Sequence, residues 1–136
     1  MLKSYTNGKN WEDEVIEYYN NRGYFVYKIP TMNGGTVFDI IAVRKGTALM
    51  IECKHIKGSK LYYKSSGLEK KTNEIDHFIG ITGNNLYIYV KSDTDGVFWT
   101  TWANSSKLLK KQGYLHTKDM IKADMNVAKR PKPKKK

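Results

Sequence analysis

The sequence predicts one α/β domain built on a mixed central sheet with helices on its faces. Helix-like and strand-like segments follow one another in the order α-β-β-β-α-β-β-α, and no repeat is visible. The chain has 136 residues, of which 40% are hydrophobic, and this is enough for one modest core without disulfide bonds. No glycine-rich phosphate loop precedes a helix, so nucleotide hydrolysis is not expected.

The chain is expected to open with a helix and a strand. Apolar residues at helical spacing over 9–22, with acids in the first turns, indicate a helix that Asn7 caps and Gly23 ends. Residues 24–29 are β-branched and aromatic, which is typical of a strand, and Pro30 ends it.

Two further strands should form a hairpin. Residues 36–43 and 47–56 are both rich in apolar and β-branched side chains, and a short turn at 44–46 joins them. The second of these strands is apolar on both faces apart from one pair of charged residues, so it is predicted to lie centrally in the sheet.

The second half of the chain continues the alternation of helices and strands. We expect a polar loop at 57–67, a helix at 68–80, a strand at 85–91, a turn at 92–96, a strand at 97–103, a short helix at 104–114 and a weak helix at 117–125. Asn104 or Ser105 should cap the short helix.

The charge of the chain points to a polyanionic partner. The formal net charge is +11, which favours nucleic acid first and an anionic membrane second. Residues 123–136 are rich in lysine and contain two prolines, so we expect a folded domain at 1–122 followed by a disordered basic tail; a nuclear-import signal is the other interpretation of that tail. No stretch approaches the roughly 20 apolar residues that span a bilayer, and no secretion signal is visible. The single cysteine fits a reducing cytoplasm.

Glu52 and Lys54 are the first candidate functional residues. They lie two positions apart on a predicted strand and therefore share one face, together with Met50 and Ile56. A half-buried carboxylate is costly unless it is paired or binds a metal ion. The other interpretation is a surface salt bridge on an edge strand.

Two further acids are predicted to point inward. Asp39 interrupts an apolar strand and would lie beside Glu52; alternatively, it is a capping or turn aspartate near the start of that strand. On the first helix, about 100° per residue places Glu12 near Tyr19 and Trp11 on the apolar side, away from the other acids. The alternative is a frayed first turn in which Glu12 is exposed.

Three carboxylates are therefore expected to converge, with an ammonium group beside them: Glu12, Asp39, Glu52 and Lys54. Oxygen ligands of this kind suit a hard divalent cation, above all Mg²⁺, and Mn²⁺ is expected to substitute. One or two such ions could polarise a phosphodiester and activate water. Lys54 would orient the nucleophile or neutralise charge on the phosphorus; a general-base role is less favoured because neighbouring carboxylates stabilise the charged ammonium.

Four pieces of the sequence resemble a known nuclease superfamily. "GKNWEDEVI", "RGYFVYKIP", "FDIIAV" and "MIECK" are similar to the PD-(D/E)XK nucleases and, more narrowly, to the archaeal-type Holliday junction resolvases. The similarity covers residues 8–56 and is loose beyond them, and Phe38 stands where the signature has proline. The resemblance implies a restriction-endonuclease-like fold with Glu12, Asp39, Glu52 and Lys54 as the catalytic set.

The same resemblance implies further features of the site. The carbonyl of Cys53 would also contact the metal, and Thr31 would stand in for a loop serine that assists catalysis in the family. A homodimer is implied as well. Trp99, Trp102 and Tyr114 are candidates for its interface, although they could equally belong to the core.

Basic residues around the site are predicted to bind DNA phosphates, and the alternative for the segment after residue 56 is a solvated loop. Binding should be salt-sensitive, because each neutralised phosphate releases counterions. The predicted DNA-binding residues are Lys9, Lys28, Thr31, Lys57, Lys60, Lys64, Lys70 and Lys71. His55 and His77 are expected to be structural.

The sequence therefore predicts a Mg²⁺-dependent endonuclease that acts as a two-fold homodimer on four-way-junction or branched DNA, by symmetric phosphodiester hydrolysis. Within the enzyme class, the alternative is another nuclease of the same superfamily, of restriction-like, nicking or flap type. The non-enzymatic alternative is a basic nucleic-acid-binding module. An archaeal or viral source would suit such a protein.

Overall fold

The computed structural model describes residues 10–30 and 36–125. Lys9, Thr31 and most of the predicted tail lie outside these ranges. The elements are α2 (Trp11–Asn20), β1 (Phe25–Lys28), β2 (Ile40–Arg44), β3 (Thr47–Ile56), β4 (Lys60–Tyr62), α3 (Leu68–Thr82), β5 (Leu86–Ser92), β6 (Gly96–Thr101), α4 (Trp102–Gln112), β7 (Tyr114–His116), a 3-10 turn (Thr117–Asp119) and β8 (Ile121–Lys122).

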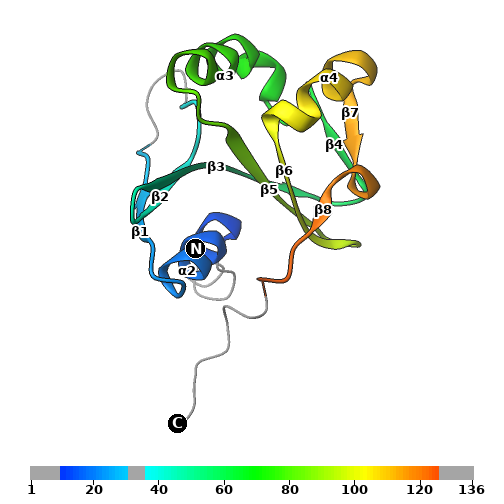
Figure 1. Ribbon diagram of the computed structural model, residues 1–136. Coiled ribbons are helices and arrows are strands. Elements are labelled where there is room, and N and C mark those ends of the chain that lie inside the picture. The colour runs from blue at the N-terminus through cyan, green and yellow to red at the C-terminus, as the bar shows by residue number, and fades with distance from the viewer. Residues whose placement is uncertain (1–9, 31–35, 126–136) are drawn as a thin grey trace.

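Strands β1, β2, β3, β5, β6 and β8 form a mixed sheet in that order, and β4 pairs with β7 in a second, two-stranded sheet. Helix α2 covers one face of the large sheet, whereas α3 and α4 cover the other (Figure 1). The fold class and the two-sided cover of the sheet agree with the sequence prediction.

Strand β3 occupies the central position that its apolar pattern predicts. It pairs antiparallel with β2 and parallel with β5. Met50 packs in the core under α3 and α4, and Ile51 packs in the core under α2, so alternate residues of the strand serve opposite faces. Glu52 is on the same face as Met50, toward α3.

Helix α2 is fixed at its start. The side chain of Asn10 accepts a hydrogen bond of 2.9 Å from the Asp13 amide and caps the helix, so the predicted cap at Asn7 is wrong. The indole Nε1 of Trp11 donates to the carbonyl of Tyr89 on β5 at 3.0 Å. These contacts fix the first turn, which carries Glu12, against the sheet.

Several short elements differ from the prediction. The segment at 57–67 is not all loop, because it contains β4, and residues 36–39 precede β2 rather than belong to it. The predicted weak helix at 117–125 is wrong: a 3-10 turn leads into β8, where Ile121 pairs with Trp99. These strands are two or three residues long and depend on distant partners, so local patterning carries little information about them.

Helix α4 begins earlier than predicted. Thr101, the last residue of β6, caps it by accepting a hydrogen bond of 3.2 Å from the Asn104 amide. A strand residue thus serves as the cap, and no turn residue marks the boundary. No helix in the described ranges has the length and apolar character needed to cross a membrane.

Candidate active site

The centre of the site is the carboxylate of Glu52. Its residue is 1% exposed, and one oxygen, Oε2, lies 3.2 Å from the ammonium of Lys54 and 2.8 Å from that of Lys71. The other oxygen, Oε1, is the one buried side-chain nitrogen or oxygen in the described part of the chain that has no hydrogen-bond partner. A buried oxyanion with one side paired and one side open is suited to bind a cation.

The two lysines reach Glu52 from different elements. Lys54 extends from β3 and also donates to the carbonyl of Ser66 at 2.6 Å. Lys71 extends from the first turn of α3, and both side chains are less than one-fifth exposed, at 19% and 18%. Lys54 therefore lies beside Glu52 as predicted, and Lys71, predicted to bind DNA, pairs with the same carboxylate.

The spacing of Lys71 from the apolar residues of α3 indicates its position on the buried side of the helix. Lys71 follows Leu68 by three residues and precedes Ile75 by four, and both of these apolar residues are fully buried. The lysine therefore lies on the buried side of the helix, whereas the neighbouring Lys70 is exposed.

Asp39 lies beside Glu52, just before β2. Its backbone amide donates to the carbonyl of Ile51 at 2.9 Å, and its side-chain Oδ2 accepts from the Cys53 amide at 2.9 Å. Burial raises the pKa of the Asp39 carboxyl, and the charge of Glu52 raises it further, against the opposing effects of the Cys53 amide and the two lysines. The two acids are thus close enough to repel each other.

Glu12 lies at the rim rather than in this centre. Its carboxylate pairs with Lys28 on β1 at 3.1 Å, and its side chain is 31% exposed. Burial does not separate it from the next acids of the helix, because Asp13 and Glu14 are also half-buried, and Glu14 pairs with Lys91 at 2.8 Å. The prediction that Glu12 alone lies on the apolar side of the helix, away from the other acids, is therefore wrong, because the Glu14 side chain is less exposed, at 21%.

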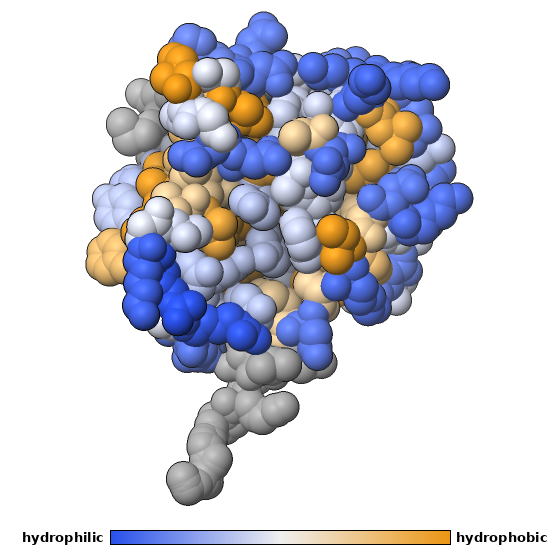
Figure 2. Space-filling view, in the orientation of Figure 1, coloured by the Kyte–Doolittle hydropathy of each residue, from blue (hydrophilic) through white to orange (hydrophobic). Residues whose placement is uncertain are grey.

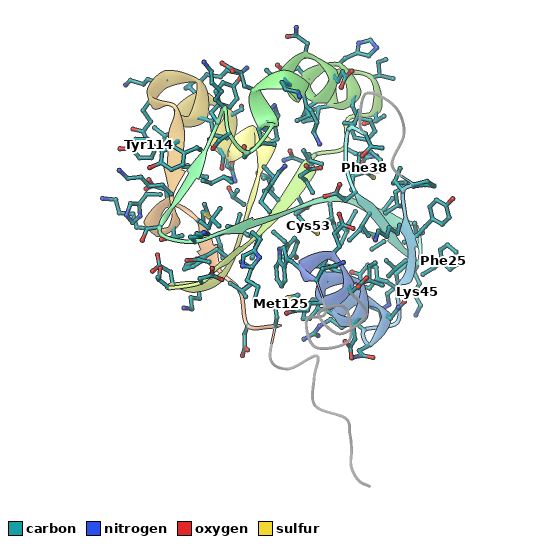
Figure 3. The ribbon with its side chains drawn as sticks, turned by 180° about the vertical axis from the view of Figure 1, so that it is seen from behind. Phe25, Phe38, Lys45, Cys53, Tyr114 and Met125 are labelled. Carbon is teal, nitrogen blue, oxygen red and sulfur yellow. The ribbon has the colours of Figure 1, made fainter. Side chains whose placement is uncertain are left out.

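Cys53 follows Glu52 on β3, and its side chain is on the opposite face of the strand. It lies on β3 facing α2 (Figure 3), and the pKa of its thiol is raised by burial first and then by the charges of Asp39, Glu12 and Glu52. In the described ranges no three His, Cys, Asp or Glu side chains gather closely enough to form a metal-ligand group. The predicted convergence of three carboxylates is therefore not seen in the described ranges: Asp39 lies near Glu52, while Glu12 pairs with Lys28.

Two clefts flank this part of β3. One, of about 420 Å³, is lined on the α2 side by residues that include Glu12, Cys53 and His55. The other, of about 470 Å³, runs from Lys54 past Lys57 and Lys60 to Tyr62. His55 pairs with Asp93 at 2.7 Å between the two clefts, as an exposed surface pair.

Of the predicted DNA-binding lysines, Lys57 and Lys60 line the second cleft. Lys57, Lys60, Lys64 and Lys70 are exposed, and the ammonium of Lys60 also lies 4.6 Å from the centre of the Tyr114 ring. Hydrophilic side chains cover much of the surface over α3, α4 and the β4–β7 pair (Figure 2). Of the aromatic interface candidates, Trp102 is 2% exposed and belongs to the core, whereas Trp99 and Tyr114 are half-buried.

Comparisons with known proteins agree on one family. Residues 3–128 match the family described as archaeal Holliday junction resolvase (Hjc). The crossover junction endodeoxyribonuclease Hjc of Methanocaldococcus jannaschii is 29% identical over 98 residues, which are 72% of this chain and 68% of the relative. The structure of Hjc from Archaeoglobus fulgidus, a Holliday junction resolvase, matches with a TM-score of 0.55 at 17% identity, over 82% of this chain and 94% of that one. At this identity the structural match supports the fold.

Proposed function

The chain belongs to the archaeal Holliday junction resolvase family, and from this premise we propose that it is a Mg²⁺-dependent endonuclease that cuts four-way DNA junctions. The observation that carries the chemistry is the buried Glu52, whose Oε1 has no partner and whose neighbour is a second acid, Asp39. Hard oxygen donors beside a cleft lined by lysines suit Mg²⁺, with Mn²⁺ as a substitute.

Asp39 and Glu52 would hold the ion, and the carbonyl of Cys53 is the third proposed oxygen ligand. Glu12 would complete the set from α2 once its carboxylate leaves Lys28, which is an exposed partner and can be replaced by solvent. When bound, the ion would polarise the scissile phosphodiester and activate water for attack.

Lys54 would stabilise the negative charge that grows on the phosphate during attack. Its ammonium is held by the Ser66 carbonyl and by Glu52, so its position is set before DNA arrives. Because two acceptors hold its ammonium in place, a positioning and charge-neutralising role fits this geometry.

DNA would approach along the cleft that runs from Lys54 past Lys57 and Lys60. Lys64 and Lys70 would contact phosphates beyond its ends, and Lys28 would extend the contact on the α2 side. Lys9 and Thr31, which lie outside the described residues, are further proposed DNA contacts. Because junction resolution needs two related cuts, we propose that two copies act as a two-fold homodimer in the cytoplasm. Trp99 and Tyr114 keep partly exposed surfaces that such a contact could use.

The test is cleavage of a labelled four-way junction and of a linear duplex of the same sequence, each with Mg²⁺ and with EDTA. We expect paired nicks at symmetric positions on the junction with Mg²⁺ only, and light scattering that gives twice the chain mass. Cutting of the linear duplex would instead favour a restriction-like or nicking enzyme. Binding without cutting under every metal condition would favour a non-catalytic DNA-binding module.

A further inference from the structure

The ammonium groups of Lys54 and Lys71 both contact the same oxygen of Glu52, and they differ in their other hydrogen bonds. Lys54 has a second acceptor in the Ser66 carbonyl at 2.6 Å. For Lys71, Glu52 at 2.8 Å is the one hydrogen-bond acceptor found in the described part of the chain. Of the two lysines, Lys71 is therefore the one whose ammonium hydrogen-bonds to Glu52 without a second acceptor, although its charge also acts on Asp39.

A carboxylate as buried as Glu52 is poorly solvated, and nearby cations replace the water that it lacks. Its residue is 1% exposed and Asp39 is beside it, so removing nearby positive charge would leave two acids facing each other in a poorly solvated site. A divalent cation bound by the same acids would meet the ammonium of Lys71 at a short distance. Two cations on one carboxylate repel each other, and the ion carries the larger charge.

We propose that Lys71 is the resident counter-ion of Glu52 in the metal-free protein and that a divalent cation binds by displacing its ammonium. This inference rests on the proposed function, because it takes Glu52 as a metal ligand. Lys71 is a positioning residue: it stabilises the empty site and weakens metal binding by competing for Glu52.

The displacement requires only the lysine side chain to move. Leu68 and Ile75 fix α3 on both sides of Lys71 because both are fully buried. The four-carbon stem of lysine is flexible, and its side chain is 18% exposed, so the ammonium has a route toward solvent. Lys54 stays in place because the Ser66 carbonyl continues to hold it.

The adjacent lysine offers a matched control. Lys70→Met and Lys71→Met each remove one positive charge from the same turn of α3, but Lys70 is exposed and only Lys71 contacts Glu52. Calorimetric titration of the DNA-free protein with Mn²⁺ measures the affinity for this ion directly. For Mg²⁺, the affinity is measured from the dependence of thermal unfolding on the ion concentration. We expect Lys71→Met to bind either ion about tenfold more tightly than the unaltered protein. Lys70→Met should bind it unchanged, and Lys71→Arg, which keeps the charge, should stay near the unaltered value.

Metal-free stability and DNA binding provide independent readouts. In EDTA, Lys71→Met should unfold at a lower urea concentration than Lys70→Met, because only the first leaves Glu52 short of a partner. Lys70→Met should reduce the salt dependence of junction binding by about one counterion, whereas Lys71→Met should not. If Lys71→Met binds the ion no more tightly than the unaltered protein, or if it loses the same counterion as Lys70→Met, the counter-ion proposal is overturned.

Glu52→Gln separates this inference from the proposed function. If Glu52→Gln binds Mn²⁺ as tightly as the unaltered protein, Glu52 is not a ligand and both proposals fail. If Glu52→Gln loses the ion while Lys71→Met and Lys70→Met bind it equally, only the counter-ion proposal fails. If Lys71→Met does not fold in EDTA, Lys71→Gln replaces it, because glutamine keeps a hydrogen-bond donor to Glu52. Lys71→Gln should also bind the ion more tightly than the unaltered protein, and an unchanged affinity would count against the counter-ion proposal.

Discussion

The two glutamates assigned to the site are held in contrasting ways. Glu52 is 1% exposed and has two ammonium groups that are themselves less than one-fifth exposed. Glu12 has a side chain that is 31% exposed, and its single partner, Lys28, is 51% exposed. The pairing of a carboxylate with an ammonium group is thus fixed by burial at Glu52 and screened by water at Glu12.

This contrast divides the candidate site into a fixed half and an adjustable half. Strands β2 and β3 with α3 set the positions of Asp39, Glu52 and Lys54, whereas the α2 acid can leave its partner at little cost. A metal site that forms in this way would start from Asp39 and Glu52 and recruit Glu12 last. Variants in the two halves should therefore differ in the size of their effects.

The largest effect is expected from Asp39→Asn. The substitution keeps an acceptor for the Cys53 amide but removes a charge next to Glu52, so the metal site loses a ligand. Cleavage of a four-way junction should fall by about 10³-fold, while the gel-shift affinity for the junction stays within a few-fold. Cleavage at the unaltered rate would show that this acid has no part in the chemistry.

Removing each glutamate in turn tests the contrast directly. In EDTA, Glu52→Gln should lower the free energy of unfolding by about 2 kcal/mol, because two poorly exposed ammonium groups lose their shared anion. Glu12→Gln should lower it by less than about 1 kcal/mol. Urea unfolding monitored by tryptophan fluorescence measures both, and equal losses would mean that burial does not distinguish the two acids.

The raised pKa of Asp39 should make the stability of the protein depend on pH. Burial and Glu52 raise this pKa above its ordinary value of 3.8, so the folded protein binds the proton more tightly than the unfolded chain. This group therefore costs stability as pH rises from 3.8 through the folded pKa. In EDTA, Asp39→Asn should be more stable than the unaltered protein at pH 7, and the difference should disappear below pH 3.8. A variant that is less stable at pH 7 would contradict the repulsion between Asp39 and Glu52.

The fixed half is also the part that the sequence predicts best. Strand β3 has the predicted bounds, and Glu52 and Lys54 share a face because the two-residue period of a strand is a local property. The short turn between β2 and β3 makes the two strands a hairpin in which Ile40 pairs with Ile51. Because the strands are antiparallel, Asp39 then lies opposite Glu52. Local patterns were sufficient for these residues.

Contacts between distant segments account for what the sequence did not predict. Lys71 pairs with Glu52, which lies 19 positions earlier in the sequence. A charged residue is expected on the exposed side of a helix, so its position on the buried side of α3 was not predicted. Strands β4 and β8 exist because of partners in β7 and β6, and their own residues carry no clear strand pattern. The position of Glu12 depends on how the capped first turn of α2 packs on β5, which helical periodicity alone does not determine.

A smaller effect is expected from the cap that positions the adjustable half. Asn10→Ala removes the hydrogen bond to the Asp13 amide and should lower the free energy of unfolding by about 1 kcal/mol. Because Glu12 lies in the turn that this bond fixes, cleavage should decrease at low Mg²⁺ and recover at high Mg²⁺. Asn10→Asp, which can still cap, is the control, and a cleavage defect that is independent of Mg²⁺ would separate the cap from the metal site.

The smallest effect is expected from Lys28→Met. The hydrogen bond and charge of Glu12 raise the pKa of Lys28, so the pair contributes stability at neutral pH and loses it as pH rises through that raised value. The Lys28 side chain is 51% exposed and that of Glu12 is 31% exposed, so screening by water should limit the stability change to about 0.3 kcal/mol. Junction affinity should fall a few-fold, with about one counterion fewer released on binding, because this lysine is also a proposed phosphate contact. A stability loss as large as that of Glu52→Gln would remove the distinction between the two halves, since an exposed pair would then be as strongly held as a buried one.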